Sequence, residues 1–123
     1  MEYADTILIV DDSKVILKML SFKIKKAGYT ILNAIDGKTA LELFDGRDID
    51  LVITDLNMPE MDGERLISEI RLKECYRYIP IVLFIADTSE DRKKIMKSCG
   101  ATMLLDKNNI NERIIPTIKK MLG

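Results

Sequence analysis

The chain has 123 residues, a formal net charge of −1 and 47% hydrophobic residues. This length and composition suit one globular domain with its own core, and no apolar run approaches the roughly 18 residues of a membrane span. The two cysteines, Cys75 and Cys99, lack the spacing of a metal motif and are interpreted as reduced thiols, while the absence of histidine excludes histidine-based acid–base or phosphate-carrier chemistry from the chain itself.

Charge is unevenly distributed along the chain. Residues 1–87 hold 16 acidic and 11 basic residues, whereas residues 88–123 hold 4 acidic and 8 basic residues. The C-terminal part is interpreted either as a surface that attracts an acidic partner or as a set of solvated, lysine-rich helix faces. Nucleic-acid binding is not indicated. Because the acidic N-terminus has no signal-peptide pattern, we expect a soluble, cytoplasmic protein without membrane contacts.

The first strand and helix of the chain are clearly patterned. Residues 6–10 form an apolar run that stops at Asp11 and Asp12, which predicts a buried strand whose tip carries two carboxylates. A helix capped by Ser13 is predicted over residues 14–27. Its face toward the sheet is predicted to contain Val15, Ile16, Met19, Leu20, Phe22, Ile24 and Ala27.

The same alternation continues to the C-terminus. Further strands are predicted over residues 29–34, 51–53, 81–86 and 102–105, and further helices over residues 36–46, 64–73, 88–100 and 108–122. Five strands alternating with five helices predict an α/β fold, with a parallel sheet covered by helices on both faces and right-handed crossovers. No glycine-rich phosphate loop follows the first strand, which argues against a nucleotide site.

Charged residues follow three of the predicted strands. Asp11 and Asp12 end the first strand, Asp55 ends the third, and Lys107 follows the fifth. With the first and third strands adjacent, the three carboxylates converge and repel one another unless a cation joins them, and Mg²⁺ suits such oxygen ligands. This set predicts a metal-assisted phosphoryl site in which Asp55 is the nucleophile and Lys107 neutralises phosphoryl charge.

Each of these residues also has a simpler interpretation. Asp55 alone is an ordinary aspartate that ends a strand and begins a turn, Asp11 and Asp12 alone are an acidic pair at a helix N-terminus, and Lys107 alone is a surface lysine. All four at three strand tips are not expected by chance.

Together with the segment of residues 54–63, these residues resemble the receiver domain of two-component response regulators, especially the stand-alone chemotaxis type. The resemblance covers essentially the whole chain. It implies a flavodoxin-like (βα)5 doubly wound fold with the strand order 2-1-3-4-5, which we take from the resemblance. It also implies one receiver domain over residues 1–123 without an effector domain.

The resemblance assigns roles to the site residues. Asp55 is expected to accept a phosphoryl group from the phosphohistidine of a partner histidine kinase or phosphotransfer protein, with Lys107 pairing with the phosphoryl oxygens. Asp12, Asp55 and the backbone carbonyl of Asn57 are expected to bind Mg²⁺ directly, and Asp11 through water. Catalysis is expected to be limited to the chain's own phosphorylation and dephosphorylation, and output to be the binding of a target protein to the face formed by residues 88–123.

Three positions depart from the family pattern. Ile85, before Ala86, stands where the family has a threonine or serine hydroxyl, and Leu104 stands where it has a tyrosine or phenylalanine. Asn108 replaces the proline that usually follows the lysine, so we expect a trans peptide bond there and a lysine aimed differently.

These departures predict a domain that binds Mg²⁺ and is phosphorylated but transmits that event weakly or by another route, because an aliphatic side chain does not sense the phosphoryl group. Thr88 is a weak substitute for the missing hydroxyl, since its spacing to Asp91 suits a helix cap. The resemblance also implies that Asn57 and Asp87, which occupy positions that in the family influence how water reaches the acyl phosphate, tune its lifetime.

Two other functions compete with this interpretation. One is a phosphorylation-independent interaction module that keeps the acidic site as a relic or for stability. The other is a phosphatase with an aspartate nucleophile, which is disfavoured because such enzymes need a second aspartate two positions on, where this chain has Asn57.

Overall fold

The computed structural model describes residues 4–86, 94 and 100–123. Its five strands are β1 (Thr6–Val10), β2 (Thr30–Ala34), β3 (Leu51–Asp55), β4 (Ile81–Ile85) and β5 (Met103–Asp106). They form one sheet in the order β2-β1-β3-β4-β5, and all four pairings are parallel. The predicted flavodoxin-like order 2-1-3-4-5 is confirmed.

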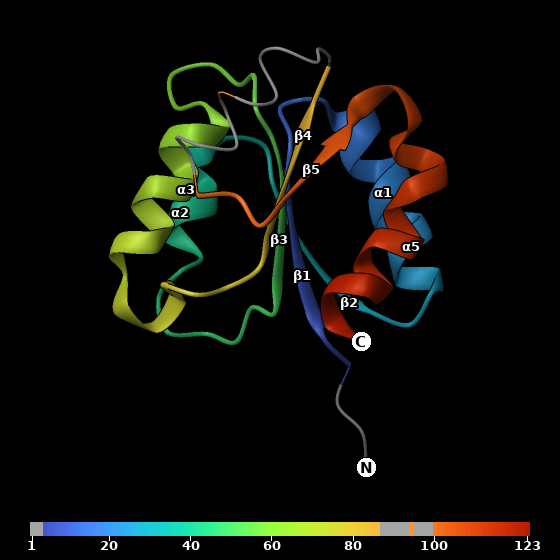
Figure 1. The fold of residues 1–123 in the computed structure, drawn as a ribbon, viewed down its shortest axis with the longest axis horizontal. Coiled ribbons are helices and arrows are strands. Elements are labelled where there is room, and N and C mark those ends of the chain that lie inside the picture. Colours follow the sequence, from blue (N-terminus) through green and yellow to red (C-terminus); the bar gives the residue numbers. More distant parts are fainter. Residues whose placement is uncertain (1–3, 87–93, 95–99) are drawn as a thin grey trace.

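Helices cover both faces of this sheet. The helices in the described ranges are α1 (Lys14–Lys26), α2 (Gly37–Glu42), α3 (Gly63–Leu72) and α5 (Ile110–Leu122), together with the short 3-10 helices η1 (Glu74–Tyr76) and η2 (Lys107–Asn109). Figure 1 shows α1 and α5 on one side of the sheet and α2 and α3 on the other. The helix predicted over residues 88–100 lies outside the described residues. None of the described helices is long and apolar enough to cross a membrane.

The core is divided by the sheet into two clusters. One contains Leu8, Val52 and Leu83 from the strands and packs against α2 and α3, whereas the other contains Ile9, Ile53 and Phe84 and packs against α1 and α5. Every residue of β3 and β4 is buried, as expected for central strands of a sheet covered on both faces.

The packing face of α1 differs from the prediction. Leu17, Leu20 and Ile24 are its buried residues. Three residues predicted to face the sheet point to solvent instead, with exposed fractions of 77%, 38% and 71% for Val15, Met19 and Phe22. At about 100° per residue these two rows lie on opposite sides of the helix, so α1 is apolar on both, and hydrophobic periodicity alone does not identify the buried side.

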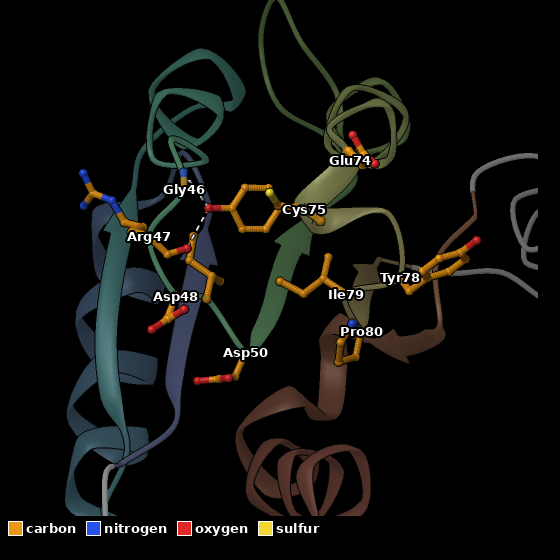
Figure 2. A pocket seen from close by; sticks show the side chains of 11 residues that line it. Gly46, Arg47, Asp48, Asp50, Glu74, Cys75, Tyr78, Ile79 and Pro80 are labelled. Atoms are coloured by element: carbon orange, nitrogen blue, oxygen red, sulfur yellow. Dashed lines mark hydrogen bonds between the residues drawn. The ribbon is translucent and has the colours of Figure 1, made fainter.

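A cavity of about 510 Å³ lies at the edge of the sheet where β3 and β4 begin (Figure 2). The Tyr76 hydroxyl accepts a hydrogen bond from the Gly46 amide at 2.9 Å and donates one to the Arg47 carbonyl at 2.6 Å. The Tyr76 ring also meets Phe44 edge-on, with the ring centroids 4.8 Å apart. None of the predicted site residues lines this cavity, because they follow the opposite ends of the strands.

Candidate functional site

The register of the sheet brings Asp11 and Asp55 together. β1 and β3 are neighbours with Val10 opposite Thr54, so the next residues, Asp11 and Asp55, follow side by side at the carboxyl edge of the sheet. Because side chains alternate along a strand, both aspartates lie on the side of Ile9 and Ile53, which is the side covered by α1 and α5. The two carboxylates therefore enter the same space from adjacent strands.

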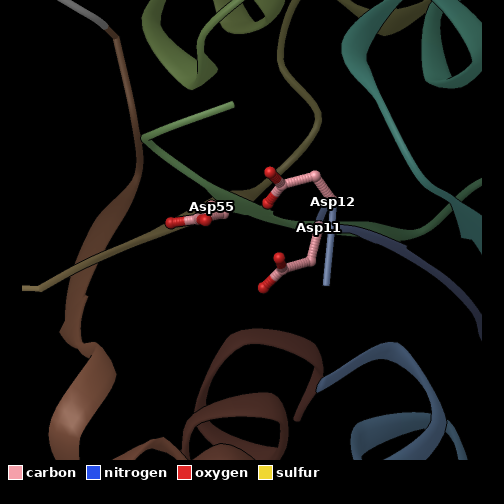
Figure 3. A group of neighbouring side chains, drawn as sticks. All are labelled: Asp11, Asp12 and Asp55. Carbon is pink, nitrogen blue, oxygen red and sulfur yellow. The ribbon is translucent and has the colours of Figure 1, made fainter. Parts of the chain in front are cut away.

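Asp12 completes an acidic group with these two residues. One carboxylate oxygen from each of Asp11, Asp12 and Asp55 lies within 4.8 Å of the others, and Figure 3 shows the three side chains around a common space. Asp11 is 0% exposed and Asp55 is 2% exposed, whereas Asp12 is exposed. Such close carboxylates repel one another, and oxygen ligands from two strand tips suit a hard divalent cation such as Mg²⁺.

Only one of the two carboxylate oxygens of Asp11 accepts a hydrogen bond. Asp11 Oδ1 accepts a hydrogen bond from the Ser13 amide at 2.8 Å, which also holds the start of α1 against the strand tip. Asp11 Oδ2 is buried and has no hydrogen-bond partner in the part of the chain that the structure describes. A buried carboxylate oxygen that accepts no hydrogen bond is costly, and its only ionic neighbour among the described residues, Lys107 Nζ, is 3.9 Å away, so this atom favours a further cation at the site.

Lys107 reaches the same group from the far side. Its Nζ lies 2.9 Å from Asp55 Oδ2 and 3.9 Å from Asp11 Oδ2, and its side chain is 26% exposed. Lys107 begins η2, where the Asp106 side chain accepts a hydrogen bond from the Asn108 amide at 2.9 Å. A proline at position 108 has no N–H to donate there. The lysine thus contacts Asp55 from a turn stabilised by the residue that replaces the usual proline.

The surroundings of Asp11 and Lys107 change the pKa of both groups. Burial is the main cause that raises the pKa of Asp11 to about 6, the neighbouring carboxyls of Asp55 and Asp12 add to it, and the Ser13 amide and Lys107 oppose it. For Lys107, burial acts to lower the pKa, but the hydrogen bond with Asp55 and the charges of the three aspartates outweigh it, so the pKa is raised. Lys107 is therefore an ammonium at neutral pH.

The loop after β3 is fixed by close packing. Asn57 is exposed in this loop, and Glu60 adopts a left-handed conformation with φ of 66°. The Asp62 side chain caps α3 by accepting a hydrogen bond from the Arg65 amide at 2.9 Å. Gly63 packs so closely that a Cβ there would lie 2.5 Å from the Asp55 carbonyl oxygen and 2.8 Å from Leu83 Cδ1. The start of α3 thus rests directly on the backbone of Asp55.

The two aliphatic positions of the predicted atypical switch lie in one cluster. Ile85 is buried, and Leu104 packs against the same cluster, on the α2 and α3 side of the sheet. Leu104 is paired in register with Leu83, two residues before Ile85. Ala86 follows the end of β4 and is exposed, while Asp87 and Thr88 lie outside the described residues.

Sequence reasoning missed two features of this site. One is Gly63, which precedes the helix predicted over residues 64–73 but begins α3 and packs on the backbone of Asp55. The other is Phe84, which lies within the strand predicted over residues 81–86 and has Lys107 Nζ over its ring, 5.6 Å from the centroid. Its position immediately before Ile85 was the available signal.

Comparisons with known proteins agree with the observed fold. The chemotaxis protein CheY4 of Vibrio cholerae is 33% identical, with a TM-score of 0.91, over 98% of this chain and 100% of that one. The receiver domain of a signal transduction histidine kinase from Syntrophus aciditrophicus is 28% identical, with a TM-score of 0.88, over 97% and 90%. The receiver domain of a Pseudomonas aeruginosa sensor histidine kinase, whose structure has a magnesium ion in its active-site cleft, shares the fold at 24% identity, with a TM-score of 0.87, over 98% and 99%.

The sequence also matches a family model directly. The matched family is the response regulator receiver domain, and the match covers residues 7–119. That range includes the strands β2 to β5, all of β1 except Thr6, and the acidic group with its lysine. With the strand order 2-1-3-4-5 and the charged strand tips in place, this chain belongs to the response regulator receiver domains of two-component signalling.

Proposed function

We propose that this chain is a phosphorylation-controlled receiver in which Asp55 accepts a phosphoryl group. The donor is the phosphohistidine of a partner histidine kinase or phosphotransfer protein. The observation that carries this proposal is the group formed by Asp11, Asp12 and Asp55, with Lys107 Nζ 2.9 Å from the proposed acceptor. The ammonium beside Asp55 supports the proposal, because it would neutralise negative charge on a phosphoryl group that is transferred to this carboxylate.

Mg²⁺ is the proposed cofactor. Asp12, Asp55 and the backbone carbonyl of Asn57 would hold it directly, and Asp11 through water, which would give Asp11 Oδ2 the hydrogen bond that it lacks. When bound, the ion supplies positive charge to the phosphoryl oxygens and relieves the repulsion among the three carboxylates. The donor set of oxygens agrees with this assignment.

The transfer itself is a displacement at phosphorus. A carboxylate oxygen of Asp55 attacks the phosphorus, the P–N bond to the donor imidazole breaks with its electron pair remaining on nitrogen, and an acyl phosphate forms on Asp55. Lys107 neutralises charge on the transferred group, and Asp12 lies on the exposed side where a donor approaches. Asn57 and Asp87 are proposed to influence how fast water removes the phosphoryl group. The chain's own catalysis ends there.

The output is proposed to be protein binding on the face formed by residues 88–123. In the described part of that face, a hollow of about 280 Å³ lies between β5 and α5, and its lining includes Arg113 and Lys120 as well as Leu104 and Pro116. Two cations around an apolar hollow suit a partner segment that is both apolar and acidic. Because Ile85 and Leu104 are aliphatic, phosphorylation is proposed to change this binding only weakly or through another route.

A mass measurement of the intact protein tests the phosphoryl acceptor. Acetyl phosphate with Mg²⁺ is expected to produce one phosphoryl adduct, which is absent with a chelator and absent in Asp55→Asn. Asp48→Asn, at the opposite edge of the sheet, is the matched control and is expected to form the adduct normally. An adduct that persists in Asp55→Asn, or its absence from the wild-type chain, would contradict the proposal.

The aliphatic pair Ile85 and Leu104 favours a second candidate, a phosphorylation-independent interaction module. The two candidates differ in one measurable quantity, the affinity for a binding partner with and without the phosphoryl mimic beryllofluoride. A receiver with any switch binds with different affinities in the two states. An interaction module binds equally well in both, because a ligand with equal affinity for two conformations shifts nothing.

A further inference from the structure

Phe84 lies in the sheet between the proposed acceptor and its lysine. β4 pairs with β3 so that Phe84 is opposite Asp55, and with β5 so that Phe84 is opposite Leu105. Phe84 and Leu105 share the core cluster on the α1 and α5 side, and Lys107 follows Leu105 by two positions. A lysine that starts beyond β5 and contacts Asp55 on β3 must cross β4, and the side chain beneath this crossing is Phe84.

The crossing ammonium lies over the face of this ring. Lys107 Nζ is 5.6 Å from the ring centroid of Phe84, within the range at which the negative face of an aromatic ring attracts a cation. Phe84 is completely buried, so core packing fixes its ring. The side chain of Lys107 is 26% exposed, so its ammonium is partly removed from water. The ring therefore presents an immobile surface to a partly dehydrated charge, which strengthens the attraction.

We propose that Phe84 is a positioning residue whose ring face holds the Lys107 ammonium over Asp55. This inference rests on the proposed function of Asp55 and Lys107. The other close partners of the ammonium are carboxylates, Asp55 at 2.9 Å and Asp11 at 3.9 Å. The attraction of these carboxylates for the ammonium weakens when they bind a cation or when Asp55 accepts a phosphoryl group. The attraction of the Phe84 ring for the ammonium does not depend on those events. The ring keeps a flexible side chain in place while its ionic partners are exchanged.

This role gives β4 a contact with the site that does not involve Ile85. The family pattern has a hydroxyl at that position, and the side chain of Ile85 lies instead in the cluster on the α2 and α3 side of the sheet. In the described structure, the contact of β4 with the phosphoryl chemistry is then made by Phe84 through Lys107. The competing explanation is that Phe84 only fills the core and that the ammonium lies near it incidentally.

Fluorination separates these two explanations, because it weakens the negative ring face stepwise while nearly keeping the shape of the side chain. We would incorporate 4-fluoro-, 3,5-difluoro- and 3,4,5-trifluorophenylalanine at position 84 and measure the rate of phosphorylation by acetyl phosphate with Mg²⁺. The rate is expected to fall with each fluorine, by about 3- to 10-fold in total. The same series at Phe44, which packs against Tyr76 away from the site, is the matched control and is expected to leave the rate unchanged.

A second pair of measurements connects the effect to the lysine. In Lys107→Ala the fluorine series at position 84 is expected to have no further effect on the residual rate, because no ammonium remains to be held. In Phe84→Leu, nuclear magnetic resonance is expected to show the ε-methylene protons of Lys107 moving downfield, since the ring current that shields them is lost.

The outcomes distinguish the two proposals. Equal rates across the fluorine series, or a fluorine effect that persists in Lys107→Ala, would overturn the positioning role of Phe84. An unchanged resonance of the Lys107 ε-methylene protons in Phe84→Leu contradicts the contact itself, and this signal is measured without any phosphoryl donor. A wild-type chain that forms no adduct contradicts the function proposed for Asp55 instead.

Discussion

At the scale of single residues, Asp11 carries a charge in a place where a charge is costly. Its folded-state pKa of about 6 lies above the value of 3.8 for a free side chain, so the folded chain binds a proton more tightly than the unfolded chain. The protonated form thus contributes stability that is fully present below pH 3.8 and is lost as the pH rises through 6. Above that range the ionised group lowers the free energy of unfolding by at most about 3 kcal/mol.

Removing this charge is therefore expected to stabilise the fold. Asp11→Asn keeps an oxygen for the Ser13 amide and is expected to raise the free energy of unfolding by roughly 1 to 2 kcal/mol above pH 6 without Mg²⁺. Below pH 3.8 the gain is expected to disappear, since Asp11 is then neutral in both states. Urea unfolding at the two pH values in a chelating buffer measures this. A gain of equal size at both would show that the charge is not its cause.

Gly63 is a second residue whose environment leads to a prediction. A Cβ at this position meets the Asp55 carbonyl oxygen at 2.5 Å, and backbone cannot move aside as a side-chain tip can. Gly63→Ala is expected to lower the free energy of unfolding by about 1 to 3 kcal/mol and to slow phosphorylation, because the tip of β3 must shift. Denaturant unfolding and the adduct assay measure the two effects.

Gly37→Ala is the matched control for this substitution. Gly37 also begins a helix, and its Cβ would approach the Met61 side chain at 2.9 Å, which is a flexible group. It is expected to cost less stability and to leave the phosphorylation rate unchanged. Equal losses in the two variants would contradict the account of Gly63.

At the scale of elements, α1 shows that an apolar residue on a helix is not always a buried residue. Leu20 is 0% exposed and Phe22 is 71% exposed, although they are two residues apart on one helix. Leu20→Ala is expected to lower the free energy of unfolding by about 2 to 5 kcal/mol, whereas Phe22→Ala changes it by about 0.5 kcal/mol or less. Thermal or urea unfolding of both variants decides this, and a large loss in Phe22→Ala would restore the face that the sequence predicted.

The pair of strands β4 and β5 provides a test of signal transmission. In the wild-type chain, beryllofluoride is expected to cause only small changes in the amide resonances of β5, because Ile85 and Leu104 are packed aliphatic side chains. The double variant Ile85→Thr, Leu104→Tyr supplies the hydroxyl and the ring of the family pattern. It is expected to enlarge these changes, and changes of the same size in both proteins would refute the assigned cause.

Whether an element could be predicted from the sequence depended on its length and on the elements that pack against it. The strands β3 and β4 were predictable because both are buried apolar runs, although the predicted bounds, 51–53 and 81–86, differ by one or two residues from Leu51–Asp55 and Ile81–Ile85. The 3-10 helices η1 and η2 were not, since three residues carry no detectable period. The buried face of α1 also depends on packing that the helix sequence does not contain.

At the scale of the whole molecule, the fold and the occupancy of the acidic site are linked. A ligand that binds only the folded chain raises the free energy of unfolding by about 2.7 kcal/mol at 100 times its dissociation constant. We expect Mg²⁺ to raise the melting temperature of the wild-type chain accordingly and to have little effect on Asp12→Asn. Asp48→Asn, which lines the cavity at the other edge, is expected to respond like the wild type. Equal responses in all three proteins would show that Mg²⁺ binds at another site.

The whole site was predictable to the extent that it depends on strand ends. Asp11, Asp12, Asp55 and Lys107 were placed at strand tips from the sequence, and the sheet brings them into one group. The burial of Asp11 and the ring beneath Lys107 were not predictable, because both arise from side-chain packing between strands that are distant in the sequence.

The two rows of α1 have a consequence for how this sequence can diverge. Leu17, Leu20 and Ile24 hold the helix on the sheet, and the opposite row of Val15, Met19 and Phe22 takes no part in that packing. No side chain belongs to both rows, so mutation can rewrite the outer one while the inner one is preserved. Within this one helix, the outer positions can therefore change in evolution while the inner positions keep the fold.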